Sequence, residues 1–358
     1  TLDLGSNLSL PQKIADLGLT VIPMDMLPCD AQSISPAFRN MYWAYGQRIL
    51  AAAEFVRNHP NLYAIYFTNF SCGPDSFLLS FVDEIMGEKP SLTLELDEHG
   101  GDAGYLTRIQ AFLDVVGAWT PRTQPPFRIP APDESPQALR RRTLWVPPMH
   151  PIGGPIYAAA LRSGGLQAEA LPLETRDSFD LGRALTRGNE CLPTACTLGS
   201  FVHLLRERRL DPDDHALFMP SADGPCRFGQ YALLQRLVLN RIGHGQAALL
   251  SPSAGNAYQG LPQKVRARLW QGLLAADLLW KAACRKRPYE ANPGDTDRTL
   301  ERAVADLARE LEHRRDIRPP LRAAIRCIAD LPVTGAPPRP LVGIVGEIYV
   351  RCNAFCND

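Results

Sequence analysis

The chain has 358 residues, of which 45% are hydrophobic and 21% are charged, a composition typical of a globular protein with sizeable buried cores. Lys plus Arg equals Asp plus Glu at 38 each, and this balance argues against nucleic acid or an anionic membrane as a partner. The sequence contains no run of about 18 apolar residues and no signal-peptide pattern, so we expect a cytoplasmic protein without a membrane partner.

Strand-length apolar segments alternate with helical patterns along most of the chain. This alternation predicts an α/β fold in which helices connect the strands of parallel sheets. More than one domain is expected, because single hydrophobic cores stop growing at about 250 to 300 residues. The expected strands are Leu19–Pro23, Ala64–Phe70, Leu92–Leu96, Leu144–Val146, Ala168–Leu171, Ala216–Pro220, Ala247–Leu250 and Val342–Val350.

The same patterns divide the chain into five parts. Residues 1–120 are expected to form a first α/β lobe, and residues 121–142, which are rich in proline, a linker. A strand, a glycine-containing turn and a helix open the second α/β lobe at 143–260, and the Arg- and Leu-rich stretch 261–330 predicts a helical insert. Residues 331–358 are expected to return a final strand to the α/β part, and this ending favours a fragment or a module of a larger protein.

Nine cysteines in a long chain argue against a secreted disulfide framework and favour reduced thiols, some of which are candidate metal ligands. Ligands of open α/β sheets bind outside the carboxyl ends of the strands. Cys72 and Cys226 each follow an expected strand, in turns that combine Gly-Pro with cysteine. Cys191 precedes an expected helix, whose dipole would favour a thiolate, and Cys352 follows the last expected strand.

Thiolates stabilise iron in both of its oxidation states, so loop cysteines that converge on a cleft predict an iron-sulfur cluster. Two alternatives remain open. Free cysteines are often simply small buried residues, and a structural zinc site could use the sequence pairs Cys191 with Cys196 and Cys352 with Cys356. Two further cysteines lie in helical patterns and are expected to serve packing: Cys284 and Cys327.

Ionisable side chains near these positions offer further chemistry. Glu95, Asp97, Glu98, His99 and Asp102 form the densest cluster, which would supply a proton donor if crowding raised a carboxyl pKa. The structural alternative is that Asp102 caps the following helix.

Two other polar features have open interpretations. Asp223 and Arg227 flank Cys226 and either position a small anion or pair with each other. The Gly153-Gly154 turn after a strand could cradle a phosphate, which would suit an α/β transferase.

Six phrases of the sequence resemble the 2-hydroxyacyl-CoA dehydratase and benzoyl-CoA reductase superfamily, specifically the dehydratase-like module of long proteins that carry an activase. They extend over nearly the whole chain and include all four candidate cysteines. They are Val21–Pro28, Asn69–Phe77, Leu94–Gly104, Asn189–Pro193, Phe218–Tyr231 and Gly346–Asn353.

The resemblance implies tandem flavodoxin-like (Rossmann-like) domains and a 4Fe-4S or double-cubane 8Fe-9S cluster at a domain interface. It also implies partners: an ATP-hydrolysing activase and a further dehydratase-like module, with a homodimer plausible on general grounds. Carried onto this chain, it marks Cys72, Cys191 and Cys226 as cofactor-binding residues and Cys352 as the next metal ligand. The pattern does not lead us to expect cysteine at the positions of Cys196 and Cys356. It also assigns no catalytic residue.

These observations lead to one functional expectation and one alternative. The expectation is the cluster-bearing component of an ATP-dependent low-potential electron-transfer system, either a reductase or a 2-hydroxyacyl-CoA dehydratase-like enzyme. The alternative is a cluster-free scaffold or regulatory module that binds an activase.

Overall fold

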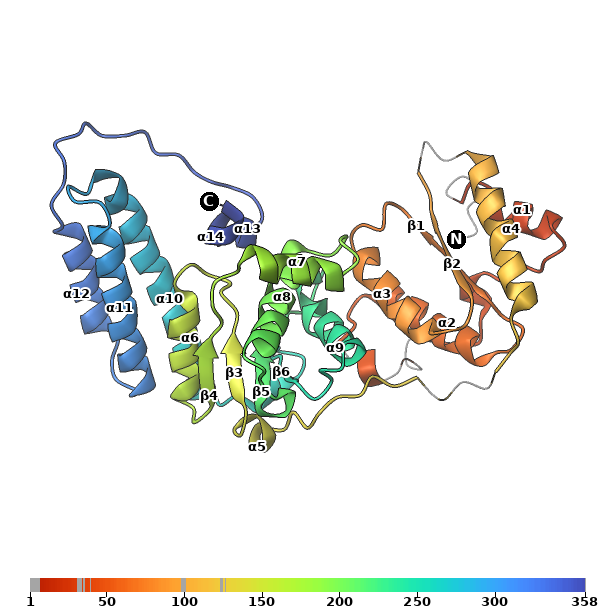
Figure 1. Ribbon diagram of the computed structural model, residues 1–358, viewed down its shortest axis with the longest axis horizontal. Helices are drawn as coiled ribbons and strands as arrows, with labels where there is room; N and C mark the ends of the chain where they lie inside the picture. The colour runs from red at the N-terminus through yellow and green to blue at the C-terminus, as the bar shows by residue number, and fades with distance from the viewer. Residues whose placement is uncertain are drawn as a thin grey trace. The chain divides into compact units, whose positions relative to one another are not determined.

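The computed structural model describes residues 7–30, 34, 36–38, 40–97, 101–122, 125 and 127–357. The chain folds into two compact units, each an α/β arrangement with a parallel sheet (Figure 1). The first unit comprises residues 1–130, 187–190 and 222–237, and the second comprises 131–186, 191–221 and 238–358. The prediction of an α/β fold with parallel sheets is therefore confirmed.

The sheet of the first unit pairs β1 (Ala64–Thr68) with β2 (Ser91–Glu95) in parallel, and the register runs from Ala64 opposite Ser91 to Thr68 opposite Glu95. The crossover helix is α3 (Asp75–Met86), which buries Phe77, Phe81 and Ile85 at helical spacing. The other elements of this unit are α1 (Leu10–Asp16), η1 (Met24–Met26), η3 (Pro36–Phe38), α2 (Ala44–Asn58), α4 (Asp102–Ala118), η5 (Arg227–Gln230) and the start of α9 (Tyr231–Arg241).

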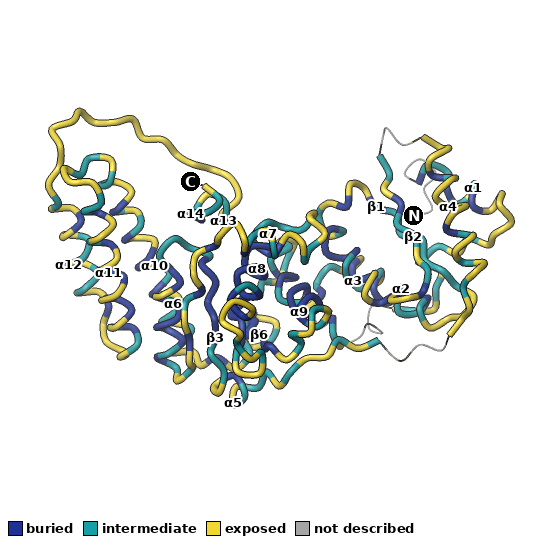
Figure 2. The backbone as a smooth tube through the Cα atoms, in the orientation of Figure 1, coloured by how far each residue is buried: buried dark blue, intermediate teal, exposed yellow. Residues whose placement is uncertain are grey.

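The second unit contains a four-stranded parallel sheet in the order β4-β3-β5-β6. The strands are β3 (Thr143–Val146), β4 (Gln167–Ala170), β5 (His215–Phe218) and β6 (Ala248–Leu250), and Figure 2 shows β3 and β6 as buried. Such burial on both faces is typical of parallel strands covered by helices. The other elements of this part of the unit are α5 (Pro136–Leu139), α6 (Gly153–Arg162), α7 (Arg176–Leu185), α8 (Leu192–Glu207), η4 (Pro212–Asp214) and η6 (Ala257–Gly260).

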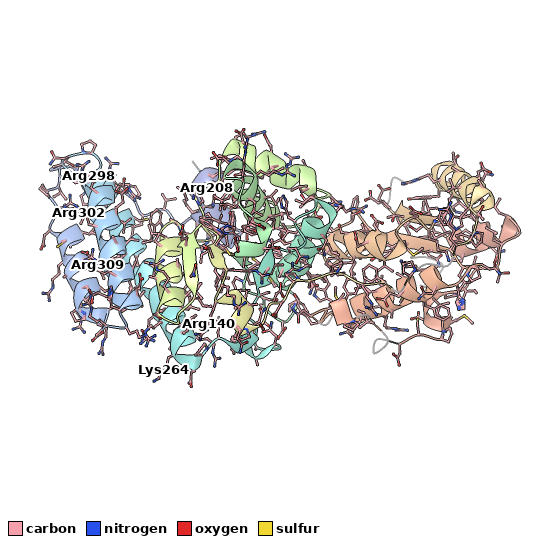
Figure 3. The ribbon with its side chains drawn as sticks, turned by 60° about the horizontal axis from the view of Figure 1, so that its bottom comes forward. Arg140, Arg208, Lys264, Arg298, Arg302 and Arg309 are labelled. Atoms are coloured by element: carbon pink, nitrogen blue, oxygen red, sulfur yellow. The ribbon has the colours of Figure 1, made fainter. Side chains whose placement is uncertain are left out.

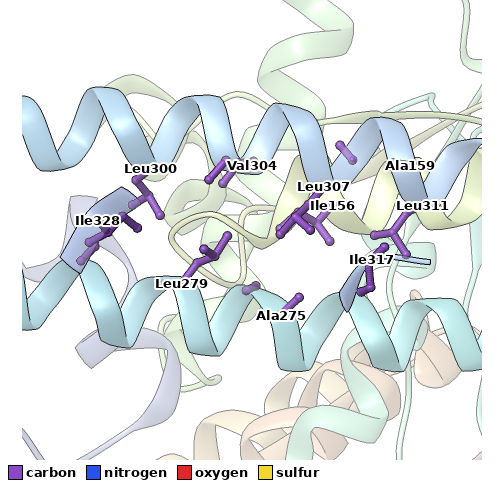
Figure 4. Close-up of a cluster of buried hydrophobic side chains, with 14 residues drawn as sticks. Ile156, Ala159, Ala275, Leu279, Leu300, Val304, Leu307, Leu311, Ile317 and Ile328 are labelled. Carbon is purple, nitrogen blue, oxygen red and sulfur yellow. The ribbon is translucent and has the colours of Figure 1, made fainter. Parts of the chain in front are cut away.

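The predicted helical region contains α10 (Gln263–Lys286), η7 (Arg287–Tyr289), α11 (Asp295–Glu312) and α12 (Arg318–Ala329). Leu279, Leu307 and Leu311 point into the core that these helices share with Ile156 of α6 (Figure 4). The helical region therefore packs against α6 within the second unit. Its many arginines extend along the surface, and Figure 3 shows Arg298 and others on α11, where Arg298 pairs with Asp295 at 2.6 Å.

Two expected strands do not form. Leu19–Pro23 is irregular: it follows Gly18, which has a φ of 84°, and ends at a proline that lacks a backbone N–H. Val342–Val350 is also wrong as a strand, because residues 341–346 are irregular and α13 (Ile348–Cys352) begins at Ile348. A β-branched run forms a stable strand only when another strand pairs with it, and here Val342 and Val345 are 84% and 91% exposed.

The chain ends with α13 and α14 (Ala354–Asn357). A hydrogen bond from the Val350 amide to the Glu347 carboxylate, at 2.8 Å, caps α13 at its start. Helical hydrogen bonding thus satisfies the backbone that the sequence pattern assigned to a strand. No helix in the described part of the chain has both the length and the apolar character needed to cross a bilayer.

Candidate functional site

The turn that carries Cys72 connects the carboxyl end of β1 to the start of α3. Phe70 and Ser71 both have left-handed backbone conformations, with φ of 55° and 49°, which are unfavourable for residues other than glycine. The buried Ser71 hydroxyl donates a hydrogen bond to Glu95 at the end of β2. Cys72 itself is exposed. The fold therefore holds a strained turn in place and presents its thiol to solvent.

Asp75, the first residue of α3, accepts hydrogen bonds from two residues of β1. Its Oδ1 accepts a hydrogen bond from the Tyr66 hydroxyl at 2.7 Å, and its Oδ2 accepts one from the Thr68 hydroxyl at 2.6 Å. Burial and the neighbouring Asp75 carboxylate raise the pKa of Tyr66 well above its ordinary value, so this phenol remains a donor. Both ends of the Cys72 turn are thereby fixed.

We predict that Asp75→Asn lowers the free energy of unfolding by about 1.5–3 kcal/mol, the usual value of hydrogen bonds to a charged group. The amide keeps the shape of the side chain but replaces one acceptor with a donor that faces a hydroxyl. Urea denaturation measures the change. Asp114→Asn on the exposed surface of α4 is the matched control and should shift stability little; equal effects of the two substitutions would contradict this role of Asp75.

Arg227 joins three segments of the first unit. Its Nη1 donates to the Ser76 hydroxyl at 2.6 Å, to the Gly73 carbonyl at 3.4 Å and to the Asn189 carbonyl at 3.3 Å. Gly73 directly follows Cys72, and Arg227 directly follows Cys226. The guanidinium thus connects the turns that carry these two cysteines and carries a permanent positive charge.

The Cys226 turn is anchored from its other side. The Tyr42 hydroxyl donates to the Cys226 carbonyl, and a side chain at Gly229 would overlap both Tyr42 and the carbonyl of Ala222. The buried Gln230 amide donates to the Asn40 carbonyl at 3.0 Å. Cys226 precedes η5 and is exposed, like Cys72.

Packing of aromatic rings holds this second turn against α3. The rings of Phe77 and Tyr231 are stacked, with centroids 5.9 Å apart and planes 10° apart. Phe228 meets Tyr231 edge to face at 5.3 Å. The start of α9 therefore fixes the position of the turn that precedes it.

The four predicted cysteines fall in different parts of the chain. Cys72 and Cys226 belong to the first unit, where Arg227 connects their turns. Cys191 is half-buried, directly follows residues 187–190 in sequence and occupies the position before α8 in the second unit. Cys352 ends α13 of the second unit. Within the described ranges, no three Cys, His, Asp or Glu side chains form a group that could hold a metal ion.

The acidic cluster is only partly described, because Glu98 and His99 lie outside the described residues. Glu95 accepts from Ser71, and Asp102 forms an ion pair with Lys13 at 2.5 Å. Asp102 is the first residue of α4 and Gly101 occupies the cap position, so the expectation that Asp102 caps the helix is wrong. Its charge instead lies in the first helical turn, where the helix dipole favours an anion.

Neighbouring side chains occupy the space around the Gly153-Gly154 turn. A side chain at Gly153 would meet the Cβ of His150 and the Tyr157 ring at 2.9 Å each, and one at Gly154 would meet Ala170 at 3.2 Å. Both glycines are buried at the start of α6. They allow close packing of the helix, which is the usual reason for glycine at such an approach.

A second group of cysteines is one that the sequence patterns missed. Cys196 is fully buried on α8, and burial raises the pKa of its thiol well above its ordinary value, with a further contribution from Cys356 of α14. The zinc alternative pairs Cys196 with Cys191 and Cys356 with Cys352. No spacing rule links Cys196 to Cys356, because the two residues lie on helices that are far apart in the sequence.

Comparison of the chain with protein-family models, with curated proteins and with solved structures found no match. The geometry of its own residues is therefore what bears on its function.

Proposed function

We propose that this chain is the iron-sulfur cluster-bearing component of an ATP-dependent low-potential electron-transfer system, related in function to a reductase or a 2-hydroxyacyl-CoA dehydratase. The observation that carries the proposal is the arrangement around Arg227. One guanidinium connects the turns of two exposed cysteines, Cys72 and Cys226, beyond the carboxyl end of a parallel strand.

Cysteine thiols are suitable ligands for an iron-sulfur cluster. Thiolates are the usual ligands of iron-sulfur clusters, and hydrogen bonds and charges near the sulfur atoms tune the potential. Cys72 and Cys226 supply thiols that are open to solvent, and Arg227 supplies a cation that offsets the negative charge of thiolates. The sequence also marks Cys191, at the N-terminus of α8, and Cys352 as ligand candidates, and both belong to the second unit.

The residues around the turns have defined roles in this proposal. Asp75 and Ser71 hold the Cys72 turn in its strained conformation, and Tyr42 holds the Cys226 turn. Both turns are therefore already ordered before the cofactor binds. A bound cluster would supply one-electron transfer at low potential. The electron donor is a partner that hydrolyses ATP, and the protein is proposed to act in the cytoplasm.

Anaerobic reconstitution tests this function. The chain is incubated with ferrous iron and sulfide, freed of excess reagents and examined by visible absorption and electron paramagnetic resonance before and after reduction with dithionite. We expect broad visible absorption that reduction bleaches, together with a paramagnetic signal in one of the two states. A spectrum without iron-thiolate absorption would contradict the proposal and favour a cluster-free module that docks an activase.

A further inference from the structure

A groove follows the surface of the helical region, between α10 and the segment that connects α11 to α12. Its volume is about 520 Å³, and its lining residues all belong to the second unit. Those of α10 begin at Lys264 and end at Leu278, a distance of about 21 Å at 1.5 Å per residue. Residues 314–318 and Leu321 of α12 form the opposite wall. The groove is therefore long enough to accommodate about four turns of a helix.

The floor of this groove is apolar. Ala275 and Ile317 are buried members of the core of the helical region, where Figure 4 shows them. Leu274 and Leu278, four residues apart on α10, are 46% and 48% exposed, and Trp270, four residues before Leu274, is 61% exposed. Side chains at this spacing are neighbours on a helix. A contiguous row of exposed apolar side chains is typical of a surface that a partner covers.

Charged side chains surround the apolar floor. Of the described residues that line the groove, five are cations and one is an anion: Lys264, Arg268, Arg314, Arg315, Arg318 and Asp316. The Arg318 guanidinium donates to Oδ1 of Asp316 at 2.9 Å and to its Oδ2 at 2.8 Å, so this carboxylate is already paired. Arg315 pairs with Glu310 at 2.6 Å. Two of the five cations are therefore neutralised by the chain itself.

The other three cations have no carboxylate partner in the described part of the chain. Arg314 donates to the Ser163 carbonyl at 2.9 Å, and Arg268 donates to the Lys264 carbonyl at 3.4 Å. Neutral carbonyl oxygens leave these positive charges in place. Lys264, which Figure 3 shows on α10, is exposed and forms no ion pair with a described residue. The groove therefore carries excess positive charge, although the chain as a whole has equal numbers of acidic and basic residues.

We propose that this groove binds an acidic amphipathic helix of a partner protein. Apolar side chains at helical spacing on the partner pack on Leu274, Leu278 and Leu321, and flanking carboxylates pair with the three cations that lack a carboxylate partner. Because α10 and α12 offer no sheet edge, a partner cannot bind here by adding a strand, whereas helix docking needs only an apolar groove. This binding does not depend on the cluster that the proposed function requires.

The shape of the surface favours a helix over an anionic membrane. Membrane-surface segments insert a projecting apolar face by about 5–10 Å into the bilayer, whereas Ala275 and Ile317 lie in the floor of a groove. The charges at the rim should accelerate association at low salt, because exposed cations attract a carboxylate-rich helix over longer distances when few counterions screen them.

The test selects ligands for the whole chain from a phage-displayed library of helical peptides of about 18 residues, long enough for a helix to form. We expect the enriched peptides to carry apolar residues at positions i, i+3 or i+4 and i+7, flanked by Asp or Glu. Their binding, measured by fluorescence anisotropy, should weaken as salt is added. A selection that enriches no peptide, or that enriches peptides with basic flanks, would overturn the proposal.

Variants of the groove show whether the selected peptides bind there. Leu278→Gln and Arg268→Glu should each weaken binding by about 10-fold or more, the loss expected at a central contact of an interface. Their controls are Val115→Gln on α4, where the valine is 55% exposed, and Arg302→Glu on the exposed surface of α11. Both controls should bind like the wild type. Groove variants that bind the peptides as tightly as the controls do would refute the assignment.

Two measurements distinguish other occupants of the groove. Vesicles of phosphatidylserine and phosphatidylcholine should bind the wild-type chain and Leu278→Gln equally weakly, and the two chains should have the same mass by light scattering. Vesicle binding that only the wild type shows would assign the groove to a membrane. A wild-type dimer that Leu278→Gln converts to a monomer would assign it to a second copy of the chain. Either result would overturn the proposal.

Discussion

Replacing either Cys72 or Cys226 with serine is expected to remove most of the iron that the wild-type chain binds after anaerobic reconstitution. A serine hydroxyl is a harder ligand than a thiol and does not ionise near neutral pH, so it replaces a thiolate poorly. Residues that only support metal ligands typically change affinity by about 10- to 100-fold when they are replaced, and loss of a ligand should exceed that range. Iron content and visible absorption measure the effect.

The controls for this prediction are cysteines that the proposal leaves unused. Cys284 on α10 and Cys327 on α12 are exposed like Cys72 and Cys226, and their serine variants should keep the wild-type iron content. Arg227→Gln tests the surroundings separately: it should lower iron affinity by about 10- to 100-fold, because the cation and its three hydrogen bonds are lost. If all of these variants bound as much iron as the wild-type chain, the assignment of Cys72 and Cys226 as ligands would be contradicted.

Placing valine at Gly182 or Gly199 is expected to cause the largest loss of stability in the second unit. The two glycines lie where α7 and α8 cross, and each lacks room for a side chain. A Cβ at Gly182 would overlap the carbonyl oxygen of Ala195, and one at Gly199 would overlap that of Ser178. Overpacking usually costs about 1–3 kcal/mol, and here the cost should reach or exceed about 3 kcal/mol because backbone atoms block the new side chain.

The shift in the urea midpoint of unfolding measures this loss of stability. An unchanged dependence of the unfolding free energy on urea concentration would show that the variant unfolds in the same transition as the wild type. Gly343→Val is the control from the same unit. It adds the same side chain where no atom lies within 4 Å, and its effect should stay within about 0.5 kcal/mol. Midpoints for Gly182→Val and Gly199→Val close to that of the control would show that the two helices can separate without cost.

Part of the four-stranded parallel sheet could be predicted because β3 and β6 are nearly continuous apolar runs. Leu144–Val146 and Ala247–Leu250 are buried on both faces, so their hydrophobicity is visible without knowledge of their neighbours. Val342–Val350 has the same appearance but no strand to pair with, and a sequence pattern does not show which strands meet. The helices of residues 261–330 were predictable for a related reason, since their apolar residues repeat at helical spacing.

The sequence predicts where the turns of the candidate site lie, but it does not predict which side chains contact one another there. The turns of Cys72 and Cys226 follow strands, and this order alone places them beyond a sheet edge. The role of Arg227 depends on Ser76 and Asn189, which are far from it in the sequence and meet it only in the folded chain. Likewise, the hydrogen bonds from Tyr349 and Asn353 to Glu174 join residues that are far apart in the chain, which local sequence cannot specify.

The most direct test of the account is the iron and acid-labile sulfide content of the chain purified without exposure to oxygen. The account predicts iron and sulfide in similar amounts, several atoms of each per chain, and their loss together in Cys72→Ser and Cys226→Ser. A colourless protein free of iron and sulfide, with all nine thiols titratable, would contradict it.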